Sequence, residues 1–300
     1  MVTPAFLNPG DTIAIVSTAR KISKDEIKPA LELIHNWELN GVIGTTIGAE
    51  EHQFAGSDEI RTMDLQHMLD DPKIKAIWCA RGGYGTVRII DRLDFSEFKK
   101  NPKWIIGYSD VTVLHSHIHL LGIETIHAQM PLELDKKSKQ TSESLRKLLF
   151  GEHHEIEIRQ ENDLNRTGKA SGMLVGGNLS ILYSLCGSES SITTNGKILF
   201  IEDLDEYLYH IDRMFYNLKR NSMLNDLAGL IVGGMSQMKD NTIPFGKQAE
   251  EIILEAVSEY DYPVCFHFPA GHIYDNRAMV LGRKVNFMVD HDGVKLEFNR

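Results

Sequence analysis

A serine and an aspartate interrupt two apolar segments in the first half of the chain. Residues 104–120 read WIIGYSDVTVLHSHIHL, and Ser109 follows Gly107 and Tyr108. A sharp strand-to-helix bend would expose the Ser109 hydroxyl as a nucleophile and direct the following backbone N–H groups toward the same point. The usual elbow reads G-x-S-x-G, whereas Val111 occupies the place of the second glycine. An ordinary helix N-cap would also explain the segment, so both interpretations stay open.

Two later segments carry side chains that could activate a serine. LFIEDLDE at residues 199–206 predicts a strand that ends in Glu202 and Asp203, and HFPAGHIYDN at residues 267–276 places His272 in a loop. Histidine is the usual general base near neutral pH, and a third group can orient it. Taken singly, these residues have plainer explanations, because the carboxylates could begin or cap a helix and the histidine could lie on the surface.

A glycine pair follows another predicted strand. RGGYG at residues 81–85 could present backbone N–H groups to an anion or an oxyanion, or could be a turn that needs positive φ. The Walker A and dinucleotide-binding glycine patterns are absent from this segment.

Histidines and a cysteine nearby suggest other chemistry. On a helix, His115 and His119 would share a face, but H-E-x-x-H is absent and no carboxylate completes a site with them, with His117 or with His127, so we expect no metal. Cys79 ends an apolar strand, so we expect it to be buried and unreactive.

The composition excludes some classes of partner. Aspartate and glutamate number 42 and lysine and arginine 32, which gives a formal charge of −10. Nucleic acids and anionic membranes attract cationic surfaces, so we expect neither as a partner. No signal peptide and no apolar stretch of about 18 residues is evident. With 3 cysteines and no disulfide pattern, the chain is expected to be cytoplasmic and reduced.

Apolar segments predict the elements that position these residues. Strands are expected at residues 12–17, 74–80, 104–107 and 124–128, and residues 22–37 have apolar side chains at helical spacing. Strands alternating with helices predict an α/β fold with a flavodoxin-like parallel sheet covered on both faces. Ligands of such sheets bind beyond the carboxyl ends of the strands, where RGGYG and GYSD both lie.

A change in composition divides the chain. We expect an N-terminal α/β domain over residues 1–150, a charged linker over residues 151–168, and a smaller C-terminal α/β domain over residues 169–300. RAMVLGRKVNFMVD and VKLEF are close together and alternate, so they predict a terminal hairpin that makes the end of this domain β-rich.

Taken together, the motifs resemble those of one family. The order of LNPGDTIAIVSTA, RGGYG, IIGYSDVTVL, GGNLSIL, LFIEDLDEYLYHIDRM and FPAGH is similar to that of the muropeptide LD-carboxypeptidases, which include the microcin C immunity peptidases. The resemblance extends from about residue 6 to about residue 290.

The resemblance implies a Ser-His-Glu triad. Ser109 would be the nucleophile, His272 the base and Glu202 the residue that orients His272. It also implies an oxyanion hole formed by the backbone N–H groups of Asp110 and Gly83. A terminal carboxylate on the substrate needs cationic or N–H-rich surroundings, and the positional candidates are Arg81, Asn276 and Arg277.

The resemblance also implies the reaction. The family releases D-Ala from a peptidoglycan stem tetrapeptide without a cofactor, and its members suggest a homodimer. The connection between Ser109 and Glu202 is short, with little room for the extended loop typical of the immunity branch, which favours muropeptide cleavage. Two alternatives stay open: a microcin-type peptidase acting on a peptidyl- or aminoacyl-nucleotide, and a non-catalytic protein that holds an anion at RGGYG.

Overall fold

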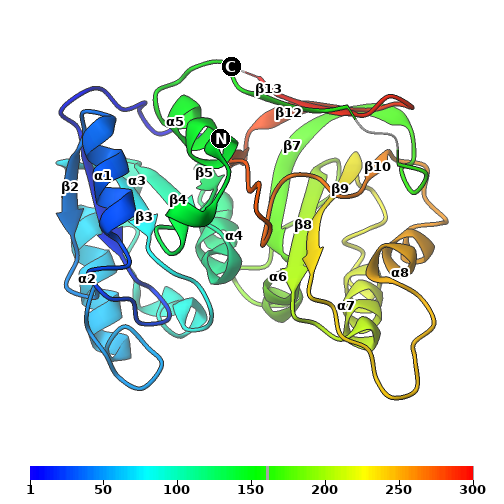
Figure 1. Cartoon of the computed structure of the whole chain (residues 1–300), viewed down its shortest axis with the longest axis horizontal. Coiled ribbons are helices and arrows are strands. Elements are labelled where there is room, and N and C mark those ends of the chain that lie inside the picture. Colours follow the sequence, from blue (N-terminus) through cyan, green and yellow to red (C-terminus); the bar gives the residue numbers. More distant parts are fainter. Residues whose placement is uncertain (160–161, 300) are drawn as a thin grey trace.

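Two β-sheets, one in each half of the chain, organise the computed structural model, which describes residues 1–159 and 162–299 (Figure 1). In Figure 1 the first sheet, whose elements are blue to green apart from β11 near the C-terminus, stands beside the second sheet, whose elements run from green to red. None of the helices in the described residues is both long enough and apolar enough to span a bilayer.

Five parallel strands and one antiparallel strand form the first sheet, in the order β11-β5-β4-β3-β1-β2. Without β11, this is the 2-1-3-4-5 order of flavodoxin-like sheets, so the predicted fold class is confirmed. The strands are β1 (Thr12–Val16), β2 (Asn40–Ile43), β3 (Ile74–Cys79), β4 (Trp104–Gly107), β5 (Thr125–His127) and β11 (Met279–Leu281).

Helices cover both faces of this sheet because successive strand residues point to opposite sides. Ile13 and Ile15 of β1 pack in one cluster with α1 and α5, whereas Ala14 and Val16 pack in another with α2, α3 and α4. These helices are α1 (Lys28–Asn36), α2 (Asp58–Asp70), α3 (Ser96–Lys100), α4 (Thr112–Leu120) and α5 (Lys139–Leu149). Short 3₁₀ turns lie between them: η1 (Thr86–Arg88), η2 (Ile90–Arg92), η3 (Ser109–Val111) and η4 (Leu134–Lys136).

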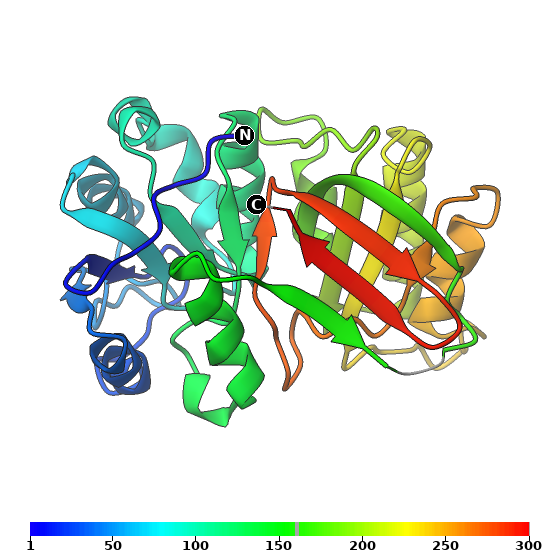
Figure 2. The ribbon, with the colours of Figure 1, turned by 90° about the horizontal axis from the view of Figure 1, so that it is seen from above.

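The second sheet is parallel at one end and antiparallel at the other, in the order β10-β9-β8-β7-β12-β13-β6. Its parallel strands are β7 (Gly168–Asn178), β8 (Ile198–Leu204), β9 (Gly229–Ser236) and β10 (Val264–Cys265). The antiparallel strands are β6 (Glu155–Ile158), β12 (Lys284–Val289) and β13 (Val294–Phe298). Figure 2 shows the β12–β13 hairpin beside β6 and β7, which confirms the predicted terminal hairpin.

One apolar cluster joins the helices of the C-terminal half to the parallel part of its sheet. Leu199 and Ile201 of β8 contribute to it, together with apolar side chains from all three helices. The helices are α6 (Leu179–Leu185), α7 (Leu208–Arg220) and α8 (Ala249–Ala256). The opposite face of β8, including Phe200, belongs to the same cluster as the N-terminal sheet. The two halves therefore share part of their core.

The structure corrects three expectations about elements. The helix predicted over residues 22–37 begins only at Lys28. Pro29 lies in its first turn, where proline is tolerated because the backbone nitrogen needs no hydrogen-bond partner. The run RAMVLGRKVNFMVD is two strands, since Gly282 turns the chain with φ 91° after β11, and β11 pairs with β5 of the first sheet. The expected linker, residues 151–168, contains β6, while residues 160–161 lie outside the described part.

Candidate active site

Ser109 lies on a sharp bend between β4 and α4. Its φ is 62°, in the left-handed region that non-glycine residues seldom adopt, and such strain is concentrated at functional sites. The side chain of Val111 fills the space above Gly107, where an added Cβ would come within 2.8 Å of it. Val111 therefore fits the bend in place of the second glycine of the usual elbow.

The RGGYG loop approaches Ser109 at a glycine. A Cβ placed on Gly82 would lie 2.9 Å from Ser109 Oγ and 3.3 Å from the Asp110 nitrogen. Among the described residues, the backbone N–H groups of Gly83 and Asp110 donate to no protein acceptor. The Asp110 carboxylate itself is buried and accepts a hydrogen bond from the Thr86 N–H at 2.8 Å. The main-chain N–H of Asp110, rather than its carboxylate, is thus the group available near Ser109.

Glu202 and His272 form a buried pair. The His272 Nδ1 lies 2.6 Å from Glu202 Oε2, and the backbone N–H of His272 donates to the same oxygen at 3.1 Å. Burial alone would lower the pKa of His272, but the adjacent Glu202 carboxylate outweighs burial and raises it above 6.5. Burial would likewise raise the pKa of Glu202, but the charge and hydrogen bond of His272 lower it. The pair therefore favours its ionised form.

His272 and Ser109 line the same cleft, whereas Glu202 is fully buried. The His272 ring lies 4.7 Å from the ring of Tyr108, the residue before Ser109. Ser109 and His272 both border a cleft of about 480 Å³, whose walls come from residues 20–133 on one side and 178–272 on the other. No hydrogen bond joins Ser109 Oγ to His272 among the described residues, and such bonds are often long in unliganded enzymes and shorten when substrate binds.

Asn178 connects the two halves of this arrangement. Its side-chain amide donates to Glu202 Oε1 at 3.3 Å and to Asp203 Oδ1 at 2.9 Å. Its backbone N–H donates to Thr112 Oγ1 at 3.0 Å, three residues beyond Ser109. Gly177 permits that approach, since its added Cβ would lie 2.5 Å from Thr112 Oγ1. Asn178 was not predicted as a site residue, although it lies within the GGNLS motif that marks the family resemblance.

Asp203 stabilises this junction instead of beginning the next helix. Its Oδ2 accepts the N–H of Ser180 at 2.9 Å, at the start of α6. Burial, followed by the charge of Glu202, raises the pKa of Asp203 to about 7. Asp203 therefore binds a first-turn N–H of α6, whose N-cap is Asn178, and does not cap α7, whose N-cap is Tyr207.

The structure separates the three candidates for a substrate carboxylate. Arg81 lines the cleft, and its Nη1 donates to the Lys21 carbonyl at 3.0 Å. Asn276 is completely buried and accepts the Gly271 N–H at 2.8 Å, so it supports the His272 loop and does not face substrate. Arg277 lies outside the cleft wall and pairs with Asp275. Sequence position alone was misleading for Asn276 and Arg277.

The other chemically suggestive residues are used structurally. Burial raises the pKa of Cys79 to about 12, as expected for an unreactive thiol. The two ring nitrogens of His115 lie 2.9 Å from Thr125 Oγ1 and 2.9 Å from the Gly107 carbonyl. His119 Nε2 lies 3.0 Å from Lys197 Nζ, and the positive charge of this lysine would repel a metal ion at that nitrogen. The ring of His127 is buried between Tyr108 and Phe200.

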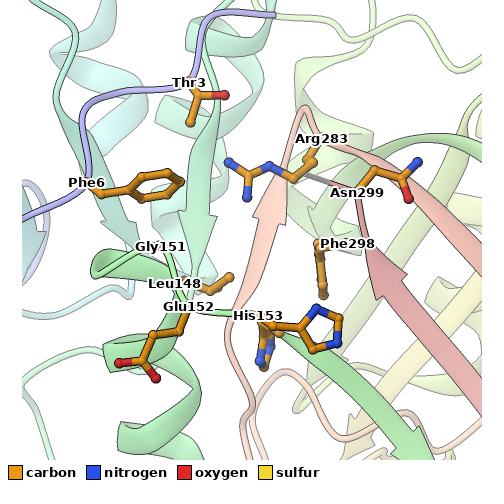
Figure 3. A pocket seen from close by; sticks show the side chains of 10 residues that line it. Thr3, Phe6, Leu148, Gly151, Glu152, His153, Arg283, Phe298 and Asn299 are labelled. Atoms are coloured by element: carbon orange, nitrogen blue, oxygen red, sulfur yellow. The ribbon is translucent and has the colours of Figure 1, made fainter.

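A second hollow lies where the N-terminal segment meets α5 and β13. Figure 3 shows Phe6, Arg283, Phe298 and His153 around it. Arg283 pairs there with the buried carboxylate of Glu124, so its charge is already neutralised. None of the residues of the Ser109 cleft lines this hollow, and among the described residues around it no nucleophile lies beside a base.

Comparison with known families identifies the family of the chain. The LD-carboxypeptidase N-terminal domain matches residues 13–128, and the LD-carboxypeptidase C-terminal domain matches residues 171–287. The chain belongs to the LD-carboxypeptidase family. This confirms the resemblance inferred from the motifs and makes the protein a serine-type carboxypeptidase, a hydrolase.

Individual LD-carboxypeptidase relatives match over nearly the whole chain. The probable murein peptide carboxypeptidase of Bacillus subtilis is 37% identical and covers 94% of this chain and 90% of its own. The microcin C7 self-immunity protein of Escherichia coli is 26% identical over 96% of this chain and 93% of its own. The structure of muramoyltetrapeptide carboxypeptidase from Oxalobacter formigenes has a TM-score of 0.86 at 23% identity and covers 96% and 99% of the two chains.

Proposed function

We propose that this LD-carboxypeptidase releases the terminal D-Ala of a peptidoglycan stem tetrapeptide through an acyl-enzyme on Ser109. The observation that supports this most is the Glu202–His272 pair, whose histidine borders the same cleft as the strained Ser109. The substrate class follows the murein peptide named for the Bacillus subtilis relative.

In the proposed first half-reaction, His272 Nε2 accepts the Ser109 proton while Oγ attacks the carbonyl carbon of the L,D amide. The negative charge that develops on the carbonyl oxygen is stabilised by the N–H groups of Gly83 and Asp110. Glu202 holds the His272 ring and stabilises its cation. The C–N bond then breaks, and His272 returns the proton to the amine of the departing D-Ala.

In the second half-reaction, water replaces the amine. His272 accepts a proton from that water, whose oxygen attacks the ester carbonyl of the acyl-enzyme. The ester bond breaks, Ser109 regains its proton from His272, and the tripeptide leaves with a new carboxylate. No other group is needed to balance the reaction.

The substrate can be tested directly. The protein is incubated with the stem tetrapeptide, with an analogue built entirely of L-residues, and with an aminoacyl-nucleotide amide, and the products are read by mass. We expect D-Ala and tripeptide from the first substrate only. Cleavage confined to the nucleotide would instead favour an activity like that of the microcin C7 self-immunity relative. Cleavage of none of them would favour a binding protein.

We also propose a homodimer in the cytoplasm, as the family resemblance and the composition imply. Sedimentation equilibrium of the purified chain tests the first statement: a mass of twice 33.9 kDa is expected, and a mass of 33.9 kDa would contradict it. Fractionation of cells that express the chain tests the second.

A further inference from the structure

We propose that Arg20, which lies between β1 and α1, binds the terminal carboxylate of the substrate and so limits the enzyme to the last residue of a peptide. This inference rests on the proposed function. A carboxypeptidase must distinguish a free terminal carboxylate from an internal amide, and a guanidinium is well suited to bind a carboxylate with two hydrogen bonds.

Both arginines that line the cleft come from its N-terminal wall. Among the described residues that line the cleft, only Arg20, Arg81 and the catalytic candidate His272 can carry a positive charge. The other wall carries Asp203, Asp205 and Glu206. The arginine wall also carries two carboxylates, but Asp110 is buried and accepts the Thr86 N–H, and Glu133 pairs with Lys136. Like charges repel at short range, so a peptide carboxylate is expected on the arginine side.

The two arginines differ in their contacts. Arg81 is already engaged, because it donates to the Lys21 carbonyl at 3.0 Å. Its charge also acts on two carboxylates. The pKa of Glu26 is lowered mainly by hydrogen bonds from Ser23, and the charge of Arg81 lowers it further. The pKa of Glu133 is lowered mainly by Lys136, and the charge of Arg81 again adds to the effect. Arg20 forms no side-chain ion pair or hydrogen bond within the described residues, so its guanidinium remains available for a ligand.

The Arg20 side chain lies directly against Gly83, whose added Cβ would be 2.5 Å from Arg20 Cδ and 2.9 Å from Nε. Gly83 has φ 107°, so a glycine is needed there both for the backbone and for this contact. Gly82, the preceding residue, would place its own added Cβ 2.9 Å from Ser109 Oγ. Arg20 is therefore beside the predicted oxyanion hole.

The backbone of Arg20 is anchored on both sides. Its carbonyl accepts a hydrogen bond from Ser17 Oγ at 2.6 Å, and its N–H donates to the Gly82 carbonyl at 3.4 Å. An isolated β-bridge also joins Arg20 to Phe54. A cation on an anchored backbone loses less conformational freedom when it binds an anion than one on a mobile loop.

The test crosses two substrates with several variants. The substrates are the tetrapeptide with a free D-Ala carboxylate and the same peptide ending in D-alaninamide. We expect the native enzyme to have a higher kcat/KM for the free acid than for the amide. In Arg20→Ala the acid-to-amide ratio of kcat/KM should fall by about tenfold to a hundredfold, as for the loss of a hydrogen bond to a charged group. The loss should appear mainly in KM, and Arg20→Lys should retain part of the preference.

Arg159 offers a matched control, because it is exposed just after β6, pairs with Glu157 and lies outside the cleft. Arg159→Ala should keep the full acid preference. If Arg20→Ala lowers the thermal unfolding midpoint, Arg20→Gln is used as well, because it removes the charge with a smaller change of shape. An unchanged acid-to-amide ratio in both Arg20 variants would overturn the proposal.

A binding measurement separates this proposal from the catalytic one. In a Ser109→Ala background, calorimetry compares the affinities for the acid and the amide without turnover. A preference for the acid that disappears in Ser109→Ala/Arg20→Ala supports the role of Arg20, even if the native enzyme released no D-Ala. A preference that persists in the double variant contradicts it, even if the native enzyme is active.

Discussion

Glu202 Oε2 accepts two hydrogen bonds from His272, one from the ring at 2.6 Å and one from the main chain at 3.1 Å. An acceptor at Nδ1 requires the tautomer that carries its proton there, which leaves Nε2 free to accept a proton from Ser109. The residue before His272 is Gly271, and a Cβ added to Gly271 would lie 2.7 Å from Glu202 Oε2. The glycine therefore lets the loop pass close to Glu202. One buried oxygen thus fixes both the tautomer and the position of the proposed base.

Loss of the base should cost more activity than loss of the group that orients it. We expect His272→Ala to lower kcat by about 10⁶-fold and Glu202→Gln by about 10⁴-fold, in line with other triads. Steady-state release of D-Ala measures both, and circular dichroism checks that the variants are folded. Equal losses, or a greater loss for Glu202→Gln, would count against these roles.

The pH dependence of kcat/KM should report the raised pKa of His272. Only the neutral ring can accept the Ser109 proton, so activity should rise with pH through a midpoint above 6.5. Glu202→Gln removes the charge that favours the imidazolium, and burial then dominates, so the midpoint should move to lower pH. Profiles of kcat/KM from about pH 4 to 9 for both proteins provide the measurement. A midpoint that is the same in both would show that another group limits activity.

The junction between Thr112 and Asn178 should contribute to both stability and activity. Thr112→Val removes the acceptor of the buried Asn178 N–H, which should lower the free energy of unfolding by about 1–3 kcal/mol. Thr112→Ser keeps the hydroxyl and serves as the control. Urea unfolding measures the effect. If valine and serine are equally stable, the hydrogen bond does not hold the two halves together.

The close approach of Gly82 to Ser109 should matter for catalysis. Gly82→Ala would place a methyl group 2.9 Å from Ser109 Oγ, in the space that the attacked carbonyl must occupy. We expect kcat/KM to fall by at least about 100-fold, as when an oxyanion-hole donor is lost, and circular dichroism checks that the variant is folded. Near-native kinetics for a folded Gly82→Ala would mean that the substrate does not approach Ser109 past this loop.

Local patterns predicted the parts of the fold that depend on local burial. The buried strands β1, β3 and β4 were evident because apolar residues continue through them. The strand β2 was missed because all four of its residues are exposed at the edge of the sheet. That β11 joins the other half of the molecule depends on pairing with β5, more than 150 residues earlier, which no local pattern records.

Some residues of the candidate site were also evident from local motifs, whereas others depend on contacts between distant segments. Ser109, Glu202 and His272 each belong to a recognisable motif, and the cleft brings Ser109 and His272 to one surface. Asn276 looked similar to a ligand-binding residue because it is polar and near His272, but its burial could be seen only in three dimensions. Arg20 was not considered because its role depends on contact with Gly83, 63 residues away.

The role of Ser109 is tested most directly when Ser109→Ala is incubated with the stem tetrapeptide and the released D-Ala is measured by mass against the native enzyme. We expect the folded variant to bind the peptide, to release no D-Ala above the uncatalysed level, and to keep the native unfolding midpoint. Release at the native rate by this purified variant would show that Ser109 is not the nucleophile.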